Sequence, residues 1–384
     1  MTSQPSLAAF HASAFMWNLG LGMTYLLIPL YANELGMSGV AIGSLVSLPV
    51  LLQIGFNLLG GAYADRIGAK RTSLVACLCI TAAAMVFAAS ASFAGLLAGQ
   101  FLLMLSRAAF WPSNWALASQ FPGDRSRNMG RLNAVTNAGQ IVGIVATGTV
   151  IAQFGFRTGF WLMAGIGLAS FALSLFIVHL RSEHTESPAL LATYRELLRR
   201  RSIFLAIMCA YISALPFSLS NSFYPILLVE QGFSSEATGW LLALRAVGSI
   251  TAGVALAHLV RHASNRVAPF AAALLSAASV GLVALLPHPL WVGLLLVGLG
   301  VGSGVMTVYF QILISSLSSP VQRGSAMALG GLGWGLSNFT TPLLVGALKD
   351  AYGIHFAFYV LGAVVLACSL ALPPLQRWAL QDQK

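Results

Sequence analysis

Residues 61–71 read Gly-Ala-Tyr-Ala-Asp-Arg-Ile-Gly-Ala-Lys-Arg, a charged segment that lies between two long apolar runs. The first run covers about residues 39–59 and the second about residues 72–93. Each run has about the 20 residues that a helix needs to cross a bilayer. Because charged side chains are costly in hydrocarbon, the segment between the runs is expected to form a tight loop at a membrane face. Its glycines, Gly61 and Gly68, favour such a turn since glycine tolerates unusual backbone angles.

The composition of the whole chain indicates a polytopic helical membrane protein. Of its 384 residues, 58% are hydrophobic and 8% are charged, whereas soluble domains carry about 25% charged residues. The net charge of +10 is concentrated in short loops between apolar runs, so we expect no nucleic-acid partner. The four cysteines fall within apolar runs and are interpreted as small buried residues, with no disulfide framework, metal site or cofactor. We find no hydrolase or metalloprotease motif, and we do not expect an enzyme.

The apolar runs predict twelve transmembrane helices in an all-α fold. A polar linker divides the chain into a first half (1–180), the linker itself (181–202) and a second half (203–384). The other loops are short. The predicted spans are approximately 8–32, 40–62, 72–92, 95–118, 130–152, 158–180, 203–228, 237–259, 267–286, 290–314, 325–347 and 354–373.

The basic residues predict the orientation of the chain. Of the 20 lysines and arginines, 16 fall on the side that holds the termini and the linker, and Arg157 and Lys349 fall on the other. The remaining two, Arg107 and Arg245, lie inside predicted spans. Positive residues accumulate on the cytoplasmic side of membrane proteins. We therefore expect both termini in the cytoplasm and the chain in the plasma (inner) membrane.

The two halves repeat one another in sequence. Pro29, Glu34, Gly36, Ser38 and Gly43 recur 196 positions later, and Gly155 and Phe160 recur 198 positions later. Matches at one offset in so short a window indicate an internal duplication. Duplicated six-helix halves are typical of transporters whose substrate site lies between the repeats near the membrane midplane.

The loop at residues 61–71, the six-plus-six organisation and the repeat together resemble the major facilitator superfamily. The loop follows the family pattern G-x-L-A-D-R-x-G-R-K, from which Tyr63 and Ala69 depart. The resemblance implies two pseudo-symmetric six-helix halves and transport by alternating access. It also implies a gating role for the loop residues Gly61, Asp65, Arg66, Gly68, Lys70 and Arg71.

Several polar residues inside the spans are candidates for the substrate cavity. Arg107 lies mid-span in the fourth helix and resembles the family's cavity arginine, and Arg245 lies mid-span in the eighth. An arginine at such a depth is expected to face a wet cavity; the alternative is a structural arginine bonded to helix carbonyls. Other residues form polar stripes, either as cavity lining or as contacts between helices. The predicted cavity residues are Arg107, Arg245, Asn18, Tyr25, Trp111, Asn114, Asn137, Gln140, Ser218, Asn221, Trp334 and Asn338.

The fifth helix carries a glycine pattern that resembles a motif of the drug–proton antiporter branch. Gly139, Gly143 and Gly148 match it, while Ile144 and Thr147 stand where proline and glycine are expected. The alternative interpretation is that small residues let two helices pack closely. The motif favours efflux of drugs or metabolites, with protons as one candidate coupling ion.

Two functions follow, and a third is kept open. The first is an exporter of small organic molecules. The second is an organic-anion transporter. All ten acidic residues fall in loops or at helix ends, whereas two arginines lie in the membrane. This distribution favours an anionic or zwitterionic substrate. The third is a transporter-like receptor that binds without moving its ligand. We expect a monomer whose partners are a small-molecule substrate and the lipid bilayer.

Overall fold

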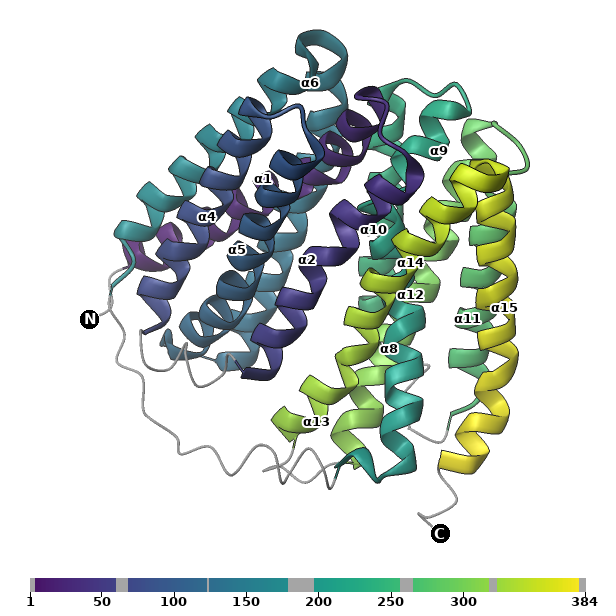
Figure 1. Ribbon diagram of the computed structural model, residues 1–384. Coiled ribbons are helices and arrows are strands. Elements are labelled where there is room, and N and C mark those ends of the chain that lie inside the picture. Colours follow the sequence, from purple (N-terminus) through teal and green to yellow (C-terminus); the bar gives the residue numbers. More distant parts are fainter. Residues whose placement is uncertain are drawn as a thin grey trace. The chain divides into compact units, whose positions relative to one another are not determined.

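The fold is described from a computed structural model, which gives residues 4–59, 68–122, 124–178, 197–255, 265–317 and 323–379. These residues form helices and contain no strand, which confirms the all-α prediction. The helices, labelled in Figure 1, are α1 (Gln4–Glu34), α2 (Gly39–Leu59), α4 (Ala69–Ala89), α5 (Phe93–Gln120), α6 (Arg125–Leu175), α8 (Arg201–Ser220), α9 (Tyr224–Glu230), α10 (Ser235–Ala255), α11 (Val267–Leu282), α12 (Pro289–Leu317), α13 (Arg323–Gly330), α14 (Leu332–Tyr352) and α15 (Ile354–Ala379).

The helices fall at the twelve predicted places, with three differences in how the spans are divided. α6 contains two predicted spans, because the chain bends sharply at Gly155, whose φ is 76°. The seventh span is divided into α8 and α9, and the eleventh into α13 and α14. Within the described residues, seven helices are long and apolar enough to cross a membrane. One of these seven helices, Arg127–Leu175 within α6, contains two of the predicted spans.

Four of the repeated glycines are explained by backbone geometry. Gly36 and Gly232 follow the ends of α1 and α9 with φ of 71° and 90°, and Gly155 and Gly353 turn the chain with φ of 76° and 87°. Side chains other than hydrogen strongly disfavour this left-handed region. Each glycine is therefore required by a helix end that occurs once in each repeat.

The chain forms two compact units, which divide at Glu186 and Ser187 and exchange two short segments. Unit 1 comprises Met1–Met37, Leu48–Glu186 and Ser234–Trp240, and unit 2 comprises Ser38–Ser47, Ser187–Phe233 and Leu241–Lys384. Consequently α2 begins in unit 2 and continues in unit 1, whereas α10 begins in unit 1 and continues in unit 2. The division of the sequence into halves stays a prediction, and the linker lies largely outside the described residues.

In unit 1, α1 packs along α6, and α4 packs against both α5 and α6 (Figure 1). Trp17 stacks on Phe110 with ring centroids 3.7 Å apart, and its Nε1 donates to Ser106 Oγ at 3.0 Å. In unit 2, α8 packs against α12 and α14, and α11 packs against α12 and α15. There Gln376 Nε2 donates to the buried Tyr309 hydroxyl at 2.8 Å. Each unit therefore has its own apolar core with a few satisfied polar groups.

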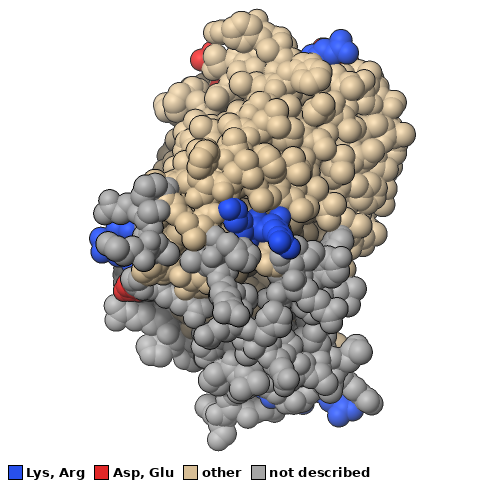
Figure 2. Space-filling view, turned by 90° about the vertical axis from the view of Figure 1, so that its left-hand side faces the viewer, with Lys and Arg blue, Asp and Glu red and all other residues tan. Residues whose placement is uncertain are grey.

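The outer surface suits a lipid environment. Large apolar side chains such as Leu78, Phe154, Trp161 and Leu168 are exposed on α4 and α6. Figure 2 shows a broad uncharged area, with lysine, arginine and acidic side chains at its edges. A soluble monomer rarely exposes so large an apolar surface, whereas lipid tails solvate it. The described helices thus agree with a multi-pass membrane protein.

Candidate functional site

Three predicted cavity residues come together in unit 1. Tyr25 lies on α1, Arg107 on α5 and Gln140 on α6. Gln140 Nε2 donates to the Tyr25 hydroxyl at 2.6 Å, and the Arg107 guanidinium interacts electrostatically with the same hydroxyl. We call Tyr25, Arg107 and Gln140 the Arg107 cluster. It combines a fixed positive charge with neutral hydrogen-bonding groups.

Aromatic side chains adjoin the Arg107 cluster along α5. Trp111 stands one turn after Arg107 and meets Trp17 and Phe110 edge to face, with centroids 6.3 Å and 5.3 Å apart. Trp115 follows one further turn along, 5.8 Å from Trp111. Indole rings offer a large, rigid apolar surface with one polar tip. The sequence predicted Trp111 but did not predict its neighbours Trp17 and Trp115.

Four of the five predicted asparagines form the same kind of local hydrogen bond. Each donates from Nδ2 to the backbone carbonyl four residues earlier in its own helix, at 2.7–2.9 Å. Such back-bonding satisfies a polar side chain without a neighbouring helix. One amide N–H of each asparagine is therefore used within its own helix, and Asn114 Nδ2 also donates to Ser73 Oγ of α4 at 3.4 Å. The amide oxygens are the groups with which a ligand could interact. The four residues are Asn18, Asn114, Asn137 and Asn338.

In unit 2, polar side chains form hydrogen bonds between α8 and α14. Trp334 Nε1 donates to Ser213 Oγ at 3.1 Å, and Ser303 of α12 donates to the Ser213 carbonyl at 2.7 Å. The predicted residue Ser218 donates to the Ser337 carbonyl at 3.3 Å. Sequence reasoning missed Ser213, because a single serine in an apolar helix carries no distinctive pattern. The predicted residue Asn221 is the C-cap of α8, at the end of that helix.

Arg245 is buried in unit 2, with 5% of its surface exposed. Its guanidinium interacts electrostatically with the buried Tyr224 hydroxyl on α9. A side chain at Gly300 of α12 would collide with the Arg245 carbonyl oxygen, so α10 and α12 lie in close backbone contact at this point. Arg107 and Arg245 thus each interact electrostatically with a tyrosine, in separate units, and a cavity shared by the two stays a prediction.

The predicted gating loop is only partly described. Gly61, Asp65 and Arg66 lie outside the described residues. Gly68 precedes α4 with φ of 89°, and Lys70 Nζ donates to the Leu175 carbonyl at the end of α6 with a distance of 2.8 Å. Arg71 is exposed. The described part of the loop therefore joins the start of α4 to the end of α6.

The glycines of the fifth predicted helix lie against other helices. A side chain at Gly139 would meet the Phe15 carbonyl, and one at Gly143 would meet the Leu19 carbonyl. Both carbonyls belong to α1, whose own Gly22 lies against the backbone of Gln140. These contacts are those expected of a close-packed pair of membrane helices. They also bring Gln140 and Tyr25 within hydrogen-bonding distance.

Comparison with known proteins gives one family and several distant relatives. The family model described as Major Facilitator Superfamily matches residues 10–317 and 207–380. The quinolone resistance protein NorA of Staphylococcus aureus is 25% identical over 175 residues, which are 45% of this chain and 45% of NorA. The multidrug resistance protein MdtH of Aeromonas hydrophila is 26% identical over 325 residues, 83% of this chain and 81% of MdtH. The chain thus spans less than half the length of NorA in the match.

Solved structures show the same fold at low identity. A bacterial homolog of the human lysosomal transporter Spinster, in an inward-facing conformation, superposes with a TM-score of 0.82 at 15% identity and covers 99% of both chains. The nucleoside transporter NupG gives 0.80 at 12% identity, covering 97% of this chain and 99% of its own. The human organic anion transporter MFSD10 gives 0.63 at 17% identity, covering 96% and 99%.

Proposed function

Because the chain belongs to the Major Facilitator Superfamily, we propose that this membrane transporter exports small organic molecules by alternating access. The similarity to proteins named for quinolone and multidrug resistance carries the proposal. The glycine pattern of the fifth predicted helix, which resembles the antiporter motif, supports it. We propose a monomer, with protons as the first coupling ion to test.

The tryptophans beside the Arg107 cluster support a flat organic substrate. Trp111 meets the buried Trp17 edge to face and lies against Trp115 at a tilted angle. Ligand sites are commonly lined by aromatic side chains with a few polar groups that fix orientation. We propose that the Trp111 and Trp115 rings, backed by the buried Trp17, bind the apolar part of a substrate and that Tyr25 and Gln140 orient its polar part.

A second candidate function is transport of organic anions, and the Arg107 cluster favours it. A guanidinium inside a membrane protein binds carboxylates through short, often bidentate hydrogen bonds. Gln140 adds a neutral donor at the same place. The resemblance in fold to a structure titled as an organic anion transporter is compatible with this alternative but does not favour it, since the identity is only 17%.

Flux through purified protein in proteoliposomes tests both functions. Counterflow of an arylammonium dye faster than in protein-free vesicles is the expected result for the exporter, and an imposed pH gradient should change its rate if protons are coupled. Selective counterflow of an arylcarboxylate would favour the anion transporter instead. Saturable binding without any flux would contradict both and would leave a transporter-like receptor.

The orientation is proposed from the basic residues and is tested by labelling. We propose cytoplasmic termini in the plasma (inner) membrane, with the exposed residues Ser38 and Ser234 outside. Single cysteines at these positions, in a background without the four native cysteines, should react with an impermeant thiol reagent added to intact cells. A cysteine at Ser187 in the linker serves as the control and should react only after lysis. Reaction of Ser187 alone in intact cells would reverse the assignment.

A further inference from the structure

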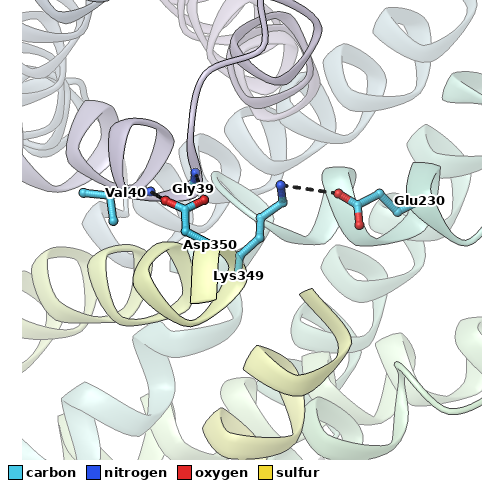
Figure 3. Close-up of polar contacts among 5 residues, drawn as sticks. All are labelled: Gly39, Val40, Glu230, Lys349 and Asp350. Atoms are coloured by element: carbon cyan, nitrogen blue, oxygen red, sulfur yellow. Dashed lines mark hydrogen bonds and ion pairs between the residues drawn. The ribbon is translucent and has the colours of Figure 1, made fainter. Parts of the chain in front are cut away.

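The first turn of α2 is capped by a carboxylate from far along the chain. Asp350, near the end of α14, accepts hydrogen bonds from the backbone amides of Gly39 at 2.5 Å and Val40 at 2.8 Å, one on each oxygen (Figure 3). The first amides of a helix have no partner within it, and a carboxylate is among their best acceptors. Here the acceptor lies 311 positions from Gly39, so the cap also joins two helices.

The same two helices are in backbone contact below the cap. A side chain at Gly39 would collide with Gly346, and one at Gly43 would collide with the Pro342 carbonyl. Such contacts require glycine on α2, because only glycine lets the backbones approach so closely. Further along, Ser47 is fully buried, and its Oγ lies 3.5 Å from the Asn338 carbonyl. The part of α2 that belongs to unit 2 is therefore seated on α14 from the cap at Asp350 to Ser47.

The repeat does not reproduce this cap. Both repeated serines bond locally: Ser38 Oγ accepts from the Ala41 amide at 3.2 Å, and Ser234 Oγ accepts from the Ala237 amide at 3.1 Å. Asp350 itself corresponds to Ala152 at the offset of 198 positions that relates Gly155 to Gly353. A carboxylate cap therefore has no counterpart at that position of α6.

An ion pair lies beside the cap, at the end of α14. Lys349 Nζ lies 3.5 Å from a Glu230 carboxylate oxygen, at the end of α9 (Figure 3). Glu230 has its repeat partner in Glu34, but Lys349 corresponds to Ile151, so this pair is also absent at the corresponding position of the first repeat. Because both side chains are partly exposed, the pair contributes little by itself. It provides a matched control for the cap.

We propose that Asp350 is a latch that holds the start of α2 on α14 and so sets how often this face of the transporter opens. The inference rests on the proposed alternating-access function, because that cycle requires helices to separate on each face in turn. Releasing the start of α2 exposes two helix amides and one carboxylate, and separates backbones that are in contact. The basic residues assign this face to the outside.

Thiol labelling of a cysteine at Ser47 measures the latch without transport. In a background lacking the native cysteines, Ser47→Cys should react slowly with a maleimide, since position 47 is buried. Asp350→Asn removes the charge from the cap, and Val40→Pro removes one donor at a helix position where proline is tolerated. Each is expected to raise the labelling rate roughly three- to tenfold, the range for a helix cap or a charge at a helix end. Glu230→Gln, which leaves the cap intact, should change the rate less than twofold.

The combination of variants decides between a latch and general loosening. Because Asp350→Asn and Val40→Pro disrupt the same contact, the double variant should label little faster than either single variant. Rates that multiply, or a rate in Asp350→Asn equal to that of the background, would overturn the latch. Protein that fails to fold with Asp350→Asn leaves Val40→Pro as the deciding variant. If the variants label faster but the protein moves no solute, the latch stands and the transport function is rejected. If the variants label at the background rate and the protein transports, the latch is rejected and the transport function stands.

Discussion

Replacing Arg107 with alanine is expected to weaken binding of an arylcarboxylate by about 2–4 kcal/mol, which is roughly 30- to 1,000-fold in affinity. The reason is the loss of a guanidinium that interacts electrostatically with Tyr25 of α1, whose hydroxyl accepts a 2.6 Å hydrogen bond from Gln140 of α6. Lysine should restore little, because an ammonium keeps the charge but lacks the planar pair of donors. The measurement is the dissociation constant in detergent by competition with a bound dye.

A control variant and a control ligand test whether the effect of Arg107→Ala is specific to this arginine and to anions. Arg157→Ala removes the same charge from an exposed site on α6, where the arginine Nε donates to the Ala88 carbonyl, and should leave binding within about twofold. An arylammonium of the same size should bind equally well or better after Arg107→Ala. Unchanged affinity for the arylcarboxylate in Arg107→Ala would reject the anion site. Arg107 would then be interpreted as a structural or gating residue of an exporter for uncharged or cationic compounds.

Gly143→Val should destabilise the protein by about 3 kcal/mol, close to the upper end of the usual cost of overpacking. The new side chain would meet the Leu19 carbonyl and the Gly22 backbone of α1, and neither can move away as a side chain could. Since α1 and α6 must separate, the hydrogen bond between Gln140 and Tyr25 should be lost as well. Thermal unfolding of the purified protein, followed by the loss of the monodisperse peak, measures the effect.

The same substitution elsewhere on α6 gives the control. A side chain at Gly165 would meet nothing within 4 Å, so Gly165→Val should change stability by no more than about 0.5 kcal/mol. If Gly143→Val unfolds at the same temperature as the unaltered protein but no longer transports, the packing interpretation is wrong. The glycine pattern would then have the functional role that its resemblance to the antiporter motif implies.

The sequence predicted the helices well because long apolar runs bounded by charges have few alternatives in a membrane. Tyr25, Arg107 and Gln140 were each proposed as cavity residues, and their membership of a substrate site stays a prediction. Helical spacing indicates which residues of one helix share a face. Spacing does not indicate the hydrogen-bond partner. The asparagine stripes therefore stay predicted cavity positions, and their bonds to the carbonyls four residues earlier became visible only in the structure.

The cap at Asp350 could not be predicted in the same way. The sequence places Asp350 at a helix end. The hydrogen-bond donors to Asp350 are backbone amides, which every residue except proline possesses. Neither Gly39 nor Val40 differs in sequence from many other residues of the chain. The exchange of the first turns of α2 and α10 between the compact units was likewise invisible, because each helix looks continuous in sequence.

The distance in sequence between the start of α2 and its acceptor has a consequence for biosynthesis. A ribosome adds about 5–20 residues per second, so the 311 residues between Gly39 and Asp350 take roughly 15–60 s to make. During that time α2 waits in the membrane without the helix on which its first turns rest. The first amides of α2 then depend on water at the membrane surface and on Ser38, which caps the Ala41 amide locally. A nascent chain that stalls before α14 would retain this unpaired helix face, a feature that membrane chaperones and proteases can recognise.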